Sequence, residues 1–412
     1  MGHMTVPPRR PPQRPHPSRR QLLRGLGAAA IAAALDGCAA GAARPDRPLL
    51  VLPRLRATPE LITRITVCTR PFRAAGPRVE LEQIGAKAVV HNYGHGGSGW
   101  SLSWGSSAIA ADLALRTGAR EIAVIGCGAL GITSALLLQR AGARVTIYAK
   151  ELPPDVRSSL ATGVWSPDSR ICMEASATPA FKERWASMAR RSFAAHQDWL
   201  GLPGKPVQFC DFYGVRDAPD GKPRSGATAA PPKEDPRPRF AELQHELIPE
   251  LSPRAERFPP GTHSLGNRSL WRNPALMFNL NAYQRMLVAD FLAAGGRVEV
   301  REFRAADELS KLEQKTLVNA TGYGAKALLG DASIIPVRGQ LARTPPQPGI
   351  EYGLYYKGAA FVPRPDGFVF QLLGEGDYFG YGLEGTEVQR PEAELAVSTI
   401  GRLFAEGPLA NR

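Results

Sequence analysis

Three glycines spaced as G-x-G-x-x-G, namely Gly126, Gly128 and Gly131, directly follow the apolar run EIAVI. Glycine suits these positions because the turn is tight, the backbone must approach a pyrophosphate closely, and the next helix must pack against the strand. The start of that helix offers unpaired N–H groups and a partial positive charge to phosphates. The motif predicts a dinucleotide ligand, and a glycine-rich turn without a ligand is the alternative.

The second strand of such a unit usually ends on an acidic residue that binds ribose hydroxyls. Ala149 occupies that place here and is followed by Lys150 and Glu151. Glu151 comes later than the usual spacing of about 20 residues after the first glycine. We assign Lys150 and Glu151 to the nucleotide site, with a charge in a solvated loop as the alternative for Glu151.

A second glycine-rich segment, residues 91–105, reads HNYGHGGSGWSLSWG. Its glycines let backbone atoms approach a flat ligand, and the helix expected after it directs its dipole at negative charge there. Chemistry that stores electrons on a ring oxygen or nitrogen would use such a site. The alternative is a strand-to-helix turn inside the core. His91 and His95 are candidate acid–base groups, but a structural role is the favoured reading of both.

Hydrophobic periodicity gives the elements that must position these segments. A βαβ unit surrounds the first glycine motif, a strand and a helix flank the second, and short strands near the C-terminus are typical of an antiparallel sheet that covers one side of a site. The proline- and charge-rich residues 214–262 are expected to form a surface excursion. The expected strands are 87–93, 121–125, 144–149, 297–302, 316–319 and those within 337–381, and the expected helices are 106–115, 131–140, 179–200 and 282–294.

Composition excludes several classes of protein. The 412 residues are 43% hydrophobic and 22% charged, which provides for a sizeable core and excludes overall disorder. Residues 1–47 hold eight arginines and two aspartates, so much of the net charge of +13 lies there. The mildly basic body carries no nucleic-acid-binding motif, and we expect no nucleic-acid partner. Five cysteines without zinc-ligand spacing predict no metal site.

The N-terminal residues have the features of an export signal. Arg19 and Arg20 precede two leucines in the manner of a twin-arginine signal, and a weakly apolar run over 25–35 follows. That run is shorter than the about 20 residues that span a bilayer. We therefore predict export to the periplasm through residues 1–43, with residues 44–63 as a linker. Cys38 ends a sequence similar to a lipoprotein cleavage box and is a candidate lipid anchor; simple cleavage and an unstructured basic tail are the alternatives.

Residues 91–105 resemble the flavin-contacting signature of the D-amino acid oxidase family. The upstream RPFRAAGPRVELE is similar to the family segment that brings the arginine for the substrate carboxylate. Further similar segments are YAKELPPDVRSSLATGVWSP, VNATGYGAKALLGD and PVRGQL, so the resemblance covers nearly all of residues 64–400. In the family the nucleotide motif comes first and the flavin signature lies near the C-terminus, whereas here the signature comes first. This order indicates a circular permutation and predicts that the chain end near Arg412 lies close to the linker before Arg64.

The resemblance implies an α/β fold in permuted order. It consists of a Rossmann-like FAD-binding domain and a substrate domain built on a mixed or antiparallel sheet. The FAD-binding domain is expected over residues 64–175 and 291–336, with a mixed region over 176–290 between them. The substrate-domain sheet and a C-terminal helix are expected over residues 337–412.

The resemblance also assigns roles to individual residues. Arg73 would bind the substrate carboxylate, because a planar and permanently charged fork suits a two-oxygen acceptor. Tyr356 would lie over the substrate, with a core aromatic as the alternative, and Gly97 would lie at the reacting ring. Arg70 and Arg78 are expected to be solvated surface charges. The implied cofactor contacts are Gly126, Gly128, Gly131, Lys150, Glu151, Ser158, Gly163, Thr321, Gly322, Gly96, Gly97, Ser98, Gly99 and Ser101.

Two departures from the family pattern concern the substrate. Ala360 stands where a tyrosine donates a hydrogen bond to the carboxylate, and Gln371, Leu372 and Leu373 replace a Gly-Gly-Thr sequence. A hydrogen bond to a charged group contributes about 1.5–3 kcal/mol, so its loss favours a different, bulkier or less carboxylate-dependent amine.

The implied reaction is an FAD-dependent oxidation of the C–N bond of a D-amino acid or related amine. Hydride passes to flavin N5, the imine hydrolyses, and oxygen or a membrane acceptor takes the electrons. One alternative is an exported FAD-binding protein with little turnover that serves a partner. Another is a nicotinamide-dependent dehydrogenase, which fits the nucleotide motif but not residues 91–105.

Overall fold

The computed structural model describes residues 48–217, 236–374 and 376–405. The predicted export signal over residues 1–43, with Cys38, lies outside the described residues, as do the chain end near Arg412 and residues 218–235 of the predicted excursion. Within the described part, no helix combines the length and the apolar character needed to cross a membrane.

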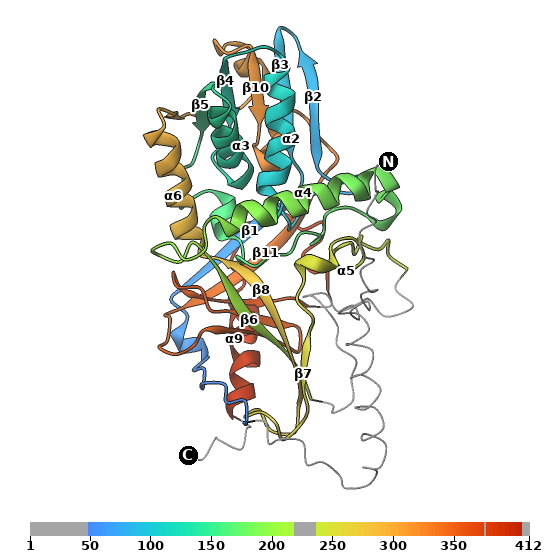
Figure 1. Ribbon diagram of the computed structural model, residues 1–412, viewed down its shortest axis with the longest axis vertical. Coiled ribbons are helices and arrows are strands. Elements are labelled where there is room, and N and C mark those ends of the chain that lie inside the picture. The colour runs from blue at the N-terminus through green and yellow to red at the C-terminus, as the bar shows by residue number, and fades with distance from the viewer. Residues whose placement is uncertain (1–47, 218–235, 375, 406–412) are drawn as a thin grey trace, which may run out of the picture. The chain divides into compact units, whose positions relative to one another are not determined.

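A six-stranded sheet brings together distant parts of the chain (Figure 1). Its order is β2-β3-β10-β4-β5-β9, and every neighbouring pair is parallel except β2 and β3. The inner strands are apolar on both faces, as is usual where helices cover a parallel sheet on two sides. The strands are β2 (Arg78–Ile84), β3 (Lys87–Tyr93), β4 (Glu121–Ile125), β5 (Arg144–Ala149), β9 (Arg297–Val300) and β10 (Thr316–Asn319).

Helices cover both faces of this sheet. On one face, α2 (Ser103–Leu115), α3 (Ala129–Arg140) and α6 (Leu280–Ala293) share a core with the strands, and Figure 1 shows α2 and α3 side by side in front of them. On the other face, α7 (Ala306–Ser310) and α8 (Ala325–Leu328) contribute leucines to a second cluster. The result is a three-layer Rossmann-like unit, and the predicted fold class is confirmed.

Helix α4 (Pro179–Gln197) crosses the sheet-covering helices in Figure 1 and packs against α2. It begins at a conventional cap, because the side chain of Thr178 accepts a hydrogen bond from the backbone N–H of Phe181 and proline follows the cap. Close approach to α2 depends on Gly105, where an added Cβ would lie 2.1 Å from the carbonyl oxygen of Met188. This contact fixes α2, and with it the residues that immediately precede α2.

An eight-stranded sheet forms the other part of the described chain. Its order is β1-β11-β14-β13-β12-β6-β8-β7, and all neighbouring pairs are antiparallel except β12 and β6. Helix α9 (Arg390–Ala405) packs its apolar side on one face, and the opposite face is turned to a cavity. The strands are β1 (Arg64–Arg73), β6 (Val207–Arg216), β7 (Glu256–Phe258), β8 (Ser269–Phe278), β11 (Ile334–Thr344), β12 (Tyr352–Tyr356), β13 (Ala359–Val362) and β14 (Phe368–Leu372).

The expectation for residues 214–262 is wrong in its described part. Strand β6 runs through residue 216, β7 lies at 256–258, and the short helix α5 (Gln244–Leu247) lies between them. Phe240 and Ile248 are buried, because apolar residues spaced among the prolines pack against α4 and β1. This stretch supplies part of the wall of the cavity.

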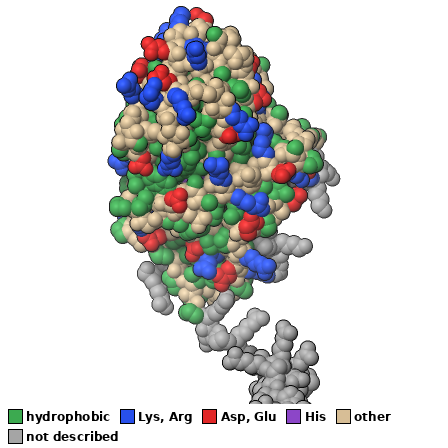
Figure 2. Space-filling model, turned by 45° about the horizontal axis from the view of Figure 1, so that its top comes forward, with side chains coloured by type: hydrophobic (Ala, Val, Ile, Leu, Met, Phe, Trp, Pro, Cys, Tyr) green, Lys and Arg blue, Asp and Glu red, His purple; other side chains and the backbone are tan. Residues whose placement is uncertain are grey.

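Charged side chains of both signs share the face of the molecule that Figure 2 draws. On the face drawn in Figure 2, Lys and Arg side chains are intermixed with Asp and Glu side chains. This face carries no stripe of a single sign.

Candidate functional site

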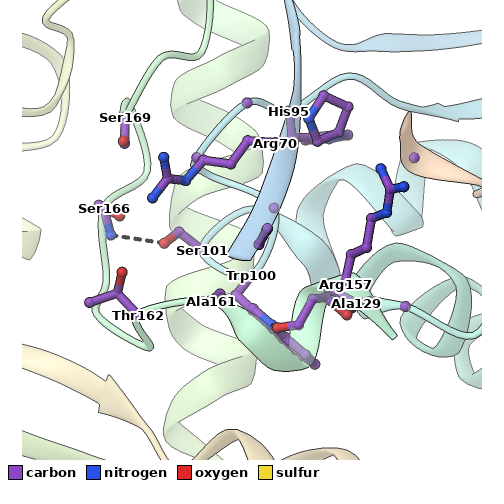
Figure 3. Close-up of a pocket in the computed structure, with 18 of the residues that line it drawn as sticks. Arg70, His95, Trp100, Ser101, Ala129, Arg157, Ala161, Thr162, Ser166 and Ser169 are labelled. Carbon is purple, nitrogen blue, oxygen red and sulfur yellow. Dashed lines mark hydrogen bonds between the residues drawn. The ribbon is translucent and has the colours of Figure 1, made fainter. Parts of the chain in front are cut away.

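A cavity of about 930 Å³ lies between the two sheets. One end is lined by the turn after β4, the middle by the 94–101 loop and residues 156–170, and the far end by the eight-stranded sheet. Figure 3 shows Arg70, Ser101, Thr162 and Ser166 around part of this space. An elongated cavity of this size suits a dinucleotide with a second, smaller molecule at one end.

The G-x-G-x-x-G motif forms the turn that a pyrophosphate requires. Gly126 has a φ of +106°, and an added Cβ there would lie 2.6 Å from the carbonyl oxygen of Ala320. At Gly131 an added Cβ would lie 2.0 Å from the carbonyl oxygen of Gly126. Gly128 caps α3 without a side chain, so the cap residue itself does not compete with a ligand for the backbone N–H groups of the first turn. These features fit a bound dinucleotide.

The predicted contacts beyond the turn also line the cavity. Ser158 accepts a hydrogen bond from the N–H of Ala129 at 3.1 Å, which ties its loop to the start of α3. Lys150 and Glu151 lie at the end of β5 and form an exposed ion pair of 3.6 Å. The other predicted residues that line the cavity are Gly163, Thr321 and Gly322, and cavity residues that sequence reasoning missed at this end are Arg157, Arg301, Glu302 and Arg304.

The 94–101 loop is held against residues 166–170. The N–H of Gly97 donates to the carbonyl oxygen of Ser169 at 2.9 Å, and the hydroxyl of Ser101 accepts from the N–H of Ser166 at 2.8 Å (Figure 3). An added Cβ at Gly96, which has a φ of +55°, would lie 2.0 Å from the carbonyl oxygen of Arg170. Gly96, Gly97, Gly99 and Ser101 line the cavity, as predicted contacts of the flat ring would.

Ser98 does not line the cavity, contrary to the prediction. Its hydroxyl donates to the carbonyl oxygen of Ser169 at 3.0 Å and the residue is fully buried. The side chain turns into the protein because the loop must satisfy its own polar groups where it packs against residues 166–170. Ser98 therefore supports the loop from behind.

The two histidines of the signature are built into the core. His95 is within 2.8 Å of the hydroxyl of Ser106, and burial lowers its pKa to about 3. His91 contacts Glu82 at 2.8 Å, and burial lowers its pKa despite that carboxylate. A histidine that stays neutral at ordinary pH and already has a hydrogen-bond partner serves structure, which agrees with the favoured reading.

Arg73 does not reach the cavity, contrary to the prediction. Its Nε donates to the hydroxyl of Ser333 at 2.8 Å and lies 3.5 Å from the carboxylate of Asp331. Arg70, expected to be a solvated surface charge, lines the cavity instead. The two arginines are three positions apart on β1 and must point to opposite faces of the sheet, so only one of them can face the cavity.

Tyr356 also lies on the wrong face for the predicted role. Its hydroxyl donates to Asp217 at 2.8 Å, and its ring packs in the cluster beneath α9. The preceding Tyr355 lines the cavity, with its ring centroid 5.8 Å from that of Phe212. Burial raises the pKa of Tyr355, so its phenol stays protonated and able to donate. Side chains alternate along a strand, which makes a shift of one position a change of face.

Both departures from the family pattern line the cavity. Ala360 is the cross-strand partner of Tyr355 and of Gln371, so these three side chains form one row of the sheet. The amide oxygen of Gln371 accepts from the hydroxyl of Thr162 at 2.8 Å. Leu373 continues the wall, whereas Leu372 packs on the opposite face.

The model for FAD dependent oxidoreductases known as DAO matches residues 121–411. The chain belongs to this DAO family. Its members are FAD-dependent oxidoreductases, and this chain is an FAD-dependent enzyme of the same kind. The predicted FAD cofactor is confirmed, and the alternative of a nicotinamide-dependent dehydrogenase is set aside.

Known relatives of this DAO-family chain include D-amino-acid oxidases. The chain is 28% identical to the D-amino-acid oxidase of Streptomyces coelicolor over 295 residues, which are 70% of this chain and 78% of that protein. It is 29% identical to the D-amino-acid oxidase of Rubrobacter xylanophilus over 298 residues, which are 71% and 78% of the two chains. A glycine oxidase structure from Bacillus cereus is 13% identical, with a TM-score of 0.45 over 71% of this chain and 79% of that one.

The Gly131→Ala variant should lose FAD and remain folded. The added methyl group meets the carbonyl oxygen of Gly126 inside the turn, so the backbone N–H groups that would hold the pyrophosphate are displaced. We expect at least a ten-fold weaker affinity for FAD, measured by titration of the apoprotein with FAD while flavin fluorescence is followed. Gly401→Ala, where an added Cβ meets the carbonyl oxygen of Ala57 at 2.1 Å outside the cavity, is the control. Equal affinity of the two variants would contradict this assignment of the turn.

Proposed function

We propose that this enzyme oxidises the C–N bond of an amino acid or related carboxylate-bearing amine to an imine, which then hydrolyses. The observation that carries the proposal is the side chain of Arg70. It lines the cavity beside the 94–101 loop, and within the described part of the chain no residue forms a hydrogen bond or ion pair with its guanidinium. A partly buried guanidinium without a direct ion-pair partner is a natural partner for a substrate carboxylate.

The surroundings of Arg70 orient its guanidinium. An added Cβ at Gly339 would lie 2.6 to 2.8 Å from the three terminal atoms of the fork, so the guanidinium lies directly over that glycine. Figure 3 shows the side chain extending from β1 towards the segment with Ser166 and Ser169. A carboxylate held at the fork would lie near Gly97 and its neighbours, where the residues of the loop would contact the isoalloxazine.

Tyr355 supports the same reaction. Its phenol can donate a hydrogen bond to the substrate from the row of the sheet that contains Ala360, where the family tyrosine is missing. When bound, FAD supplies the acceptor for the hydride from the amine carbon. The protein residues hold the carboxylate, orient the carbon and exclude water, and the reaction needs no side-chain base. Oxygen or a membrane component would then take the electrons.

Arg70→Ala should weaken binding of the amino acid by about 100-fold or more, because charge-assisted hydrogen bonds to a carboxylate are lost. Arg73→Ala, which removes a cation of the same strand outside the cavity, should stay within a few-fold of the original protein. The measurement is the anaerobic loss of the visible flavin spectrum as a panel of D- and L-amino acids and simple amines is titrated into the FAD-loaded protein.

Two results of this titration would count against the proposal. Equal losses in the two arginine variants would remove Arg70 from the substrate site. A flavin spectrum that no compound of the panel changes would favour the alternative of an FAD-binding protein with little turnover.

We also propose that the chain is a circular permutant of the family order. The family model begins at residue 121, so the signature over residues 91–105 lies before its start. The chain segments before β1 and at the C-terminal helix pack together: an added Cβ at Gly401 would lie 2.1 Å from the carbonyl oxygen of Ala57. Leu55 and Leu403 share one buried cluster, and Figure 1 places the start of the described chain near the end of α9. These neighbours support a transposed chain order within a shared fold.

Reversing the permutation should preserve the protein. A chain that begins at residue 119, continues to residue 405, and joins residue 48 through a linker of about ten flexible residues should fold and bind FAD. We expect a Tm within a few degrees of the original, because the new ends lie in the exposed turn between α2 and β4. The control is a chain opened between Leu136 and Leu137 inside α3, which should not fold. Failure of the first chain to bind FAD would count against the proposal.

We further propose that residues 1–43 direct export of the folded enzyme to the periplasm, with Cys38 as a candidate lipid anchor. The support is the sequence around Arg19 and Arg20 and the need to acquire FAD before crossing the membrane. Replacing Arg19 and Arg20 by lysine should retain the protein in the cytoplasm, measured by fractionation of the cells that express it. Unchanged periplasmic yield would contradict this route.

A further inference from the structure

A largely buried ion pair lies near Arg70 in the wall of the cavity. Nη1 of Arg170 lies 3.5 Å from the carboxylate of Asp377, and the two side chains are 12% and 16% exposed. Both residues line the cavity, and they come from distant parts of the chain. The pair therefore contributes one positive and one negative group to this wall.

Residues 376 and 377 engage all three nitrogens of the Arg170 guanidinium. Nε donates to the carbonyl oxygen of Asp377 at 2.6 Å, and Nη2 donates to that of Gly376 at 3.3 Å. The backbone of Arg170 has a φ of +51° and presses against Gly96, so the guanidinium projects from a constrained position. The guanidinium of Arg170 is thus bound by residues 376 and 377, whereas that of Arg70 forms no direct hydrogen bond or ion pair with a described residue.

The other charged groups around Asp377 are Asp168, Glu242 and Arg70. Asp168 accepts hydrogen bonds from the N–H groups of Leu243 and Gln244, which balance its buried carboxylate. Burial raises the pKa of Asp377, while Arg170 at 3.5 Å opposes this shift and favours the ionised carboxylate. Arg70 has no direct ion-pair partner, so it can bind an anionic group. The carboxylate of Asp377 would repel a second carboxylate of the substrate.

We propose that Asp377 is a specificity-determining residue: by holding Arg170 in an ion pair, so that this cation is not available to a second carboxylate, it restricts the enzyme to amines with one carboxylate and excludes those with a second acidic group. This inference rests on the proposed function, because it assumes that Arg70 binds the substrate carboxylate. The remaining wall agrees with an uncharged substrate side chain, since it includes Phe209, Phe212 and Leu276.

The test compares substrates that differ in charge and hardly in size. Glutamine and glutamate of the reactive stereochemistry are offered to the FAD-loaded enzyme, and the anaerobic rate of flavin reduction gives the glutamine-to-glutamate ratio. The original protein should prefer glutamine. Asp377→Asn should move the ratio toward glutamate by on the order of 10- to 100-fold, because a like-charge contact is removed and Arg170 becomes available to the second carboxylate. Asp377→Ser is the second neutral variant, should the first fold poorly.

Two matched variants separate charge from packing. Asp377→Glu keeps the carboxylate and should keep the original ratio. Glu392→Gln breaks the Arg338–Glu392 pair, which is 11% and 14% exposed but lies outside the cavity, and it too should leave the ratio unchanged. A shift of the ratio in Glu392→Gln as large as in Asp377→Asn would overturn the proposal, because loss of packing alone would then explain it.

A binding measurement keeps the inference testable without turnover. Butyrate and succinate, which carry one and two carboxylates, are titrated while perturbation of the flavin absorption gives their Kd values. Tighter binding of butyrate by the original protein and a shift toward succinate in Asp377→Asn support the inference, even where no amine is oxidised and the proposed function fails. A preference of the original protein for succinate and glutamate, or ratios that neutral variants leave unchanged, would overturn it.

Discussion

The parallel pairing of β10 with β3 on one side and β4 on the other is the constraint on which the site depends. Residues 316–319 bind the strand before the flavin signature and the strand before the nucleotide motif in the same direction. Both glycine-rich loops therefore leave the sheet at its carboxyl edge, where open α/β sheets hold their ligands. The order in which the chain visits the two strands has no effect on this geometry, because each strand contributes its loop by position in the sheet.

The eight-stranded sheet has to lie at a fixed distance from the carboxyl edge of the six-stranded sheet. Buried polar contacts join the eight-stranded sheet to the segment between the two. Arg364 is fully buried, pairs with Asp366, and donates to the carbonyl oxygen of Ala161 at 2.8 Å. Thr162 bonds to Gln371 across the same gap. Segment 157–166, which separates the nucleotide end of the cavity from its substrate end, is thus tied to the hairpin of β13 and β14. Buried charges of this kind stabilise little by themselves but define one arrangement of the elements that they join.

Sequence reasoning located the backbone of the site well and several of its side chains poorly. The glycines at 126, 128 and 131 are constrained by the space around their own backbone, and that constraint is visible in the sequence. Arg70 and Arg73, and likewise Tyr355 and Tyr356, are neighbours of identical type on strands. Which of them faces the cavity depends on strand register, and a slip of one position reverses the face. Ser98 was misplaced for a related reason, since a loop residue can point to either side of its backbone. Residues 240–253, which supply part of the cavity wall, were not expected there, because their prolines and charged residues are typical of surface loops.

The lining of the cavity runs from Cys68 to Asp377 and draws on both sheets. Nearly the whole chain must therefore leave the ribosome before the cavity is complete. A partial chain lacks some of the residues that line it. A ligand that binds only the folded state stabilises it by an amount that grows with the logarithm of the free ligand concentration above Kd. The stability of the finished protein is therefore linked to the concentration of FAD.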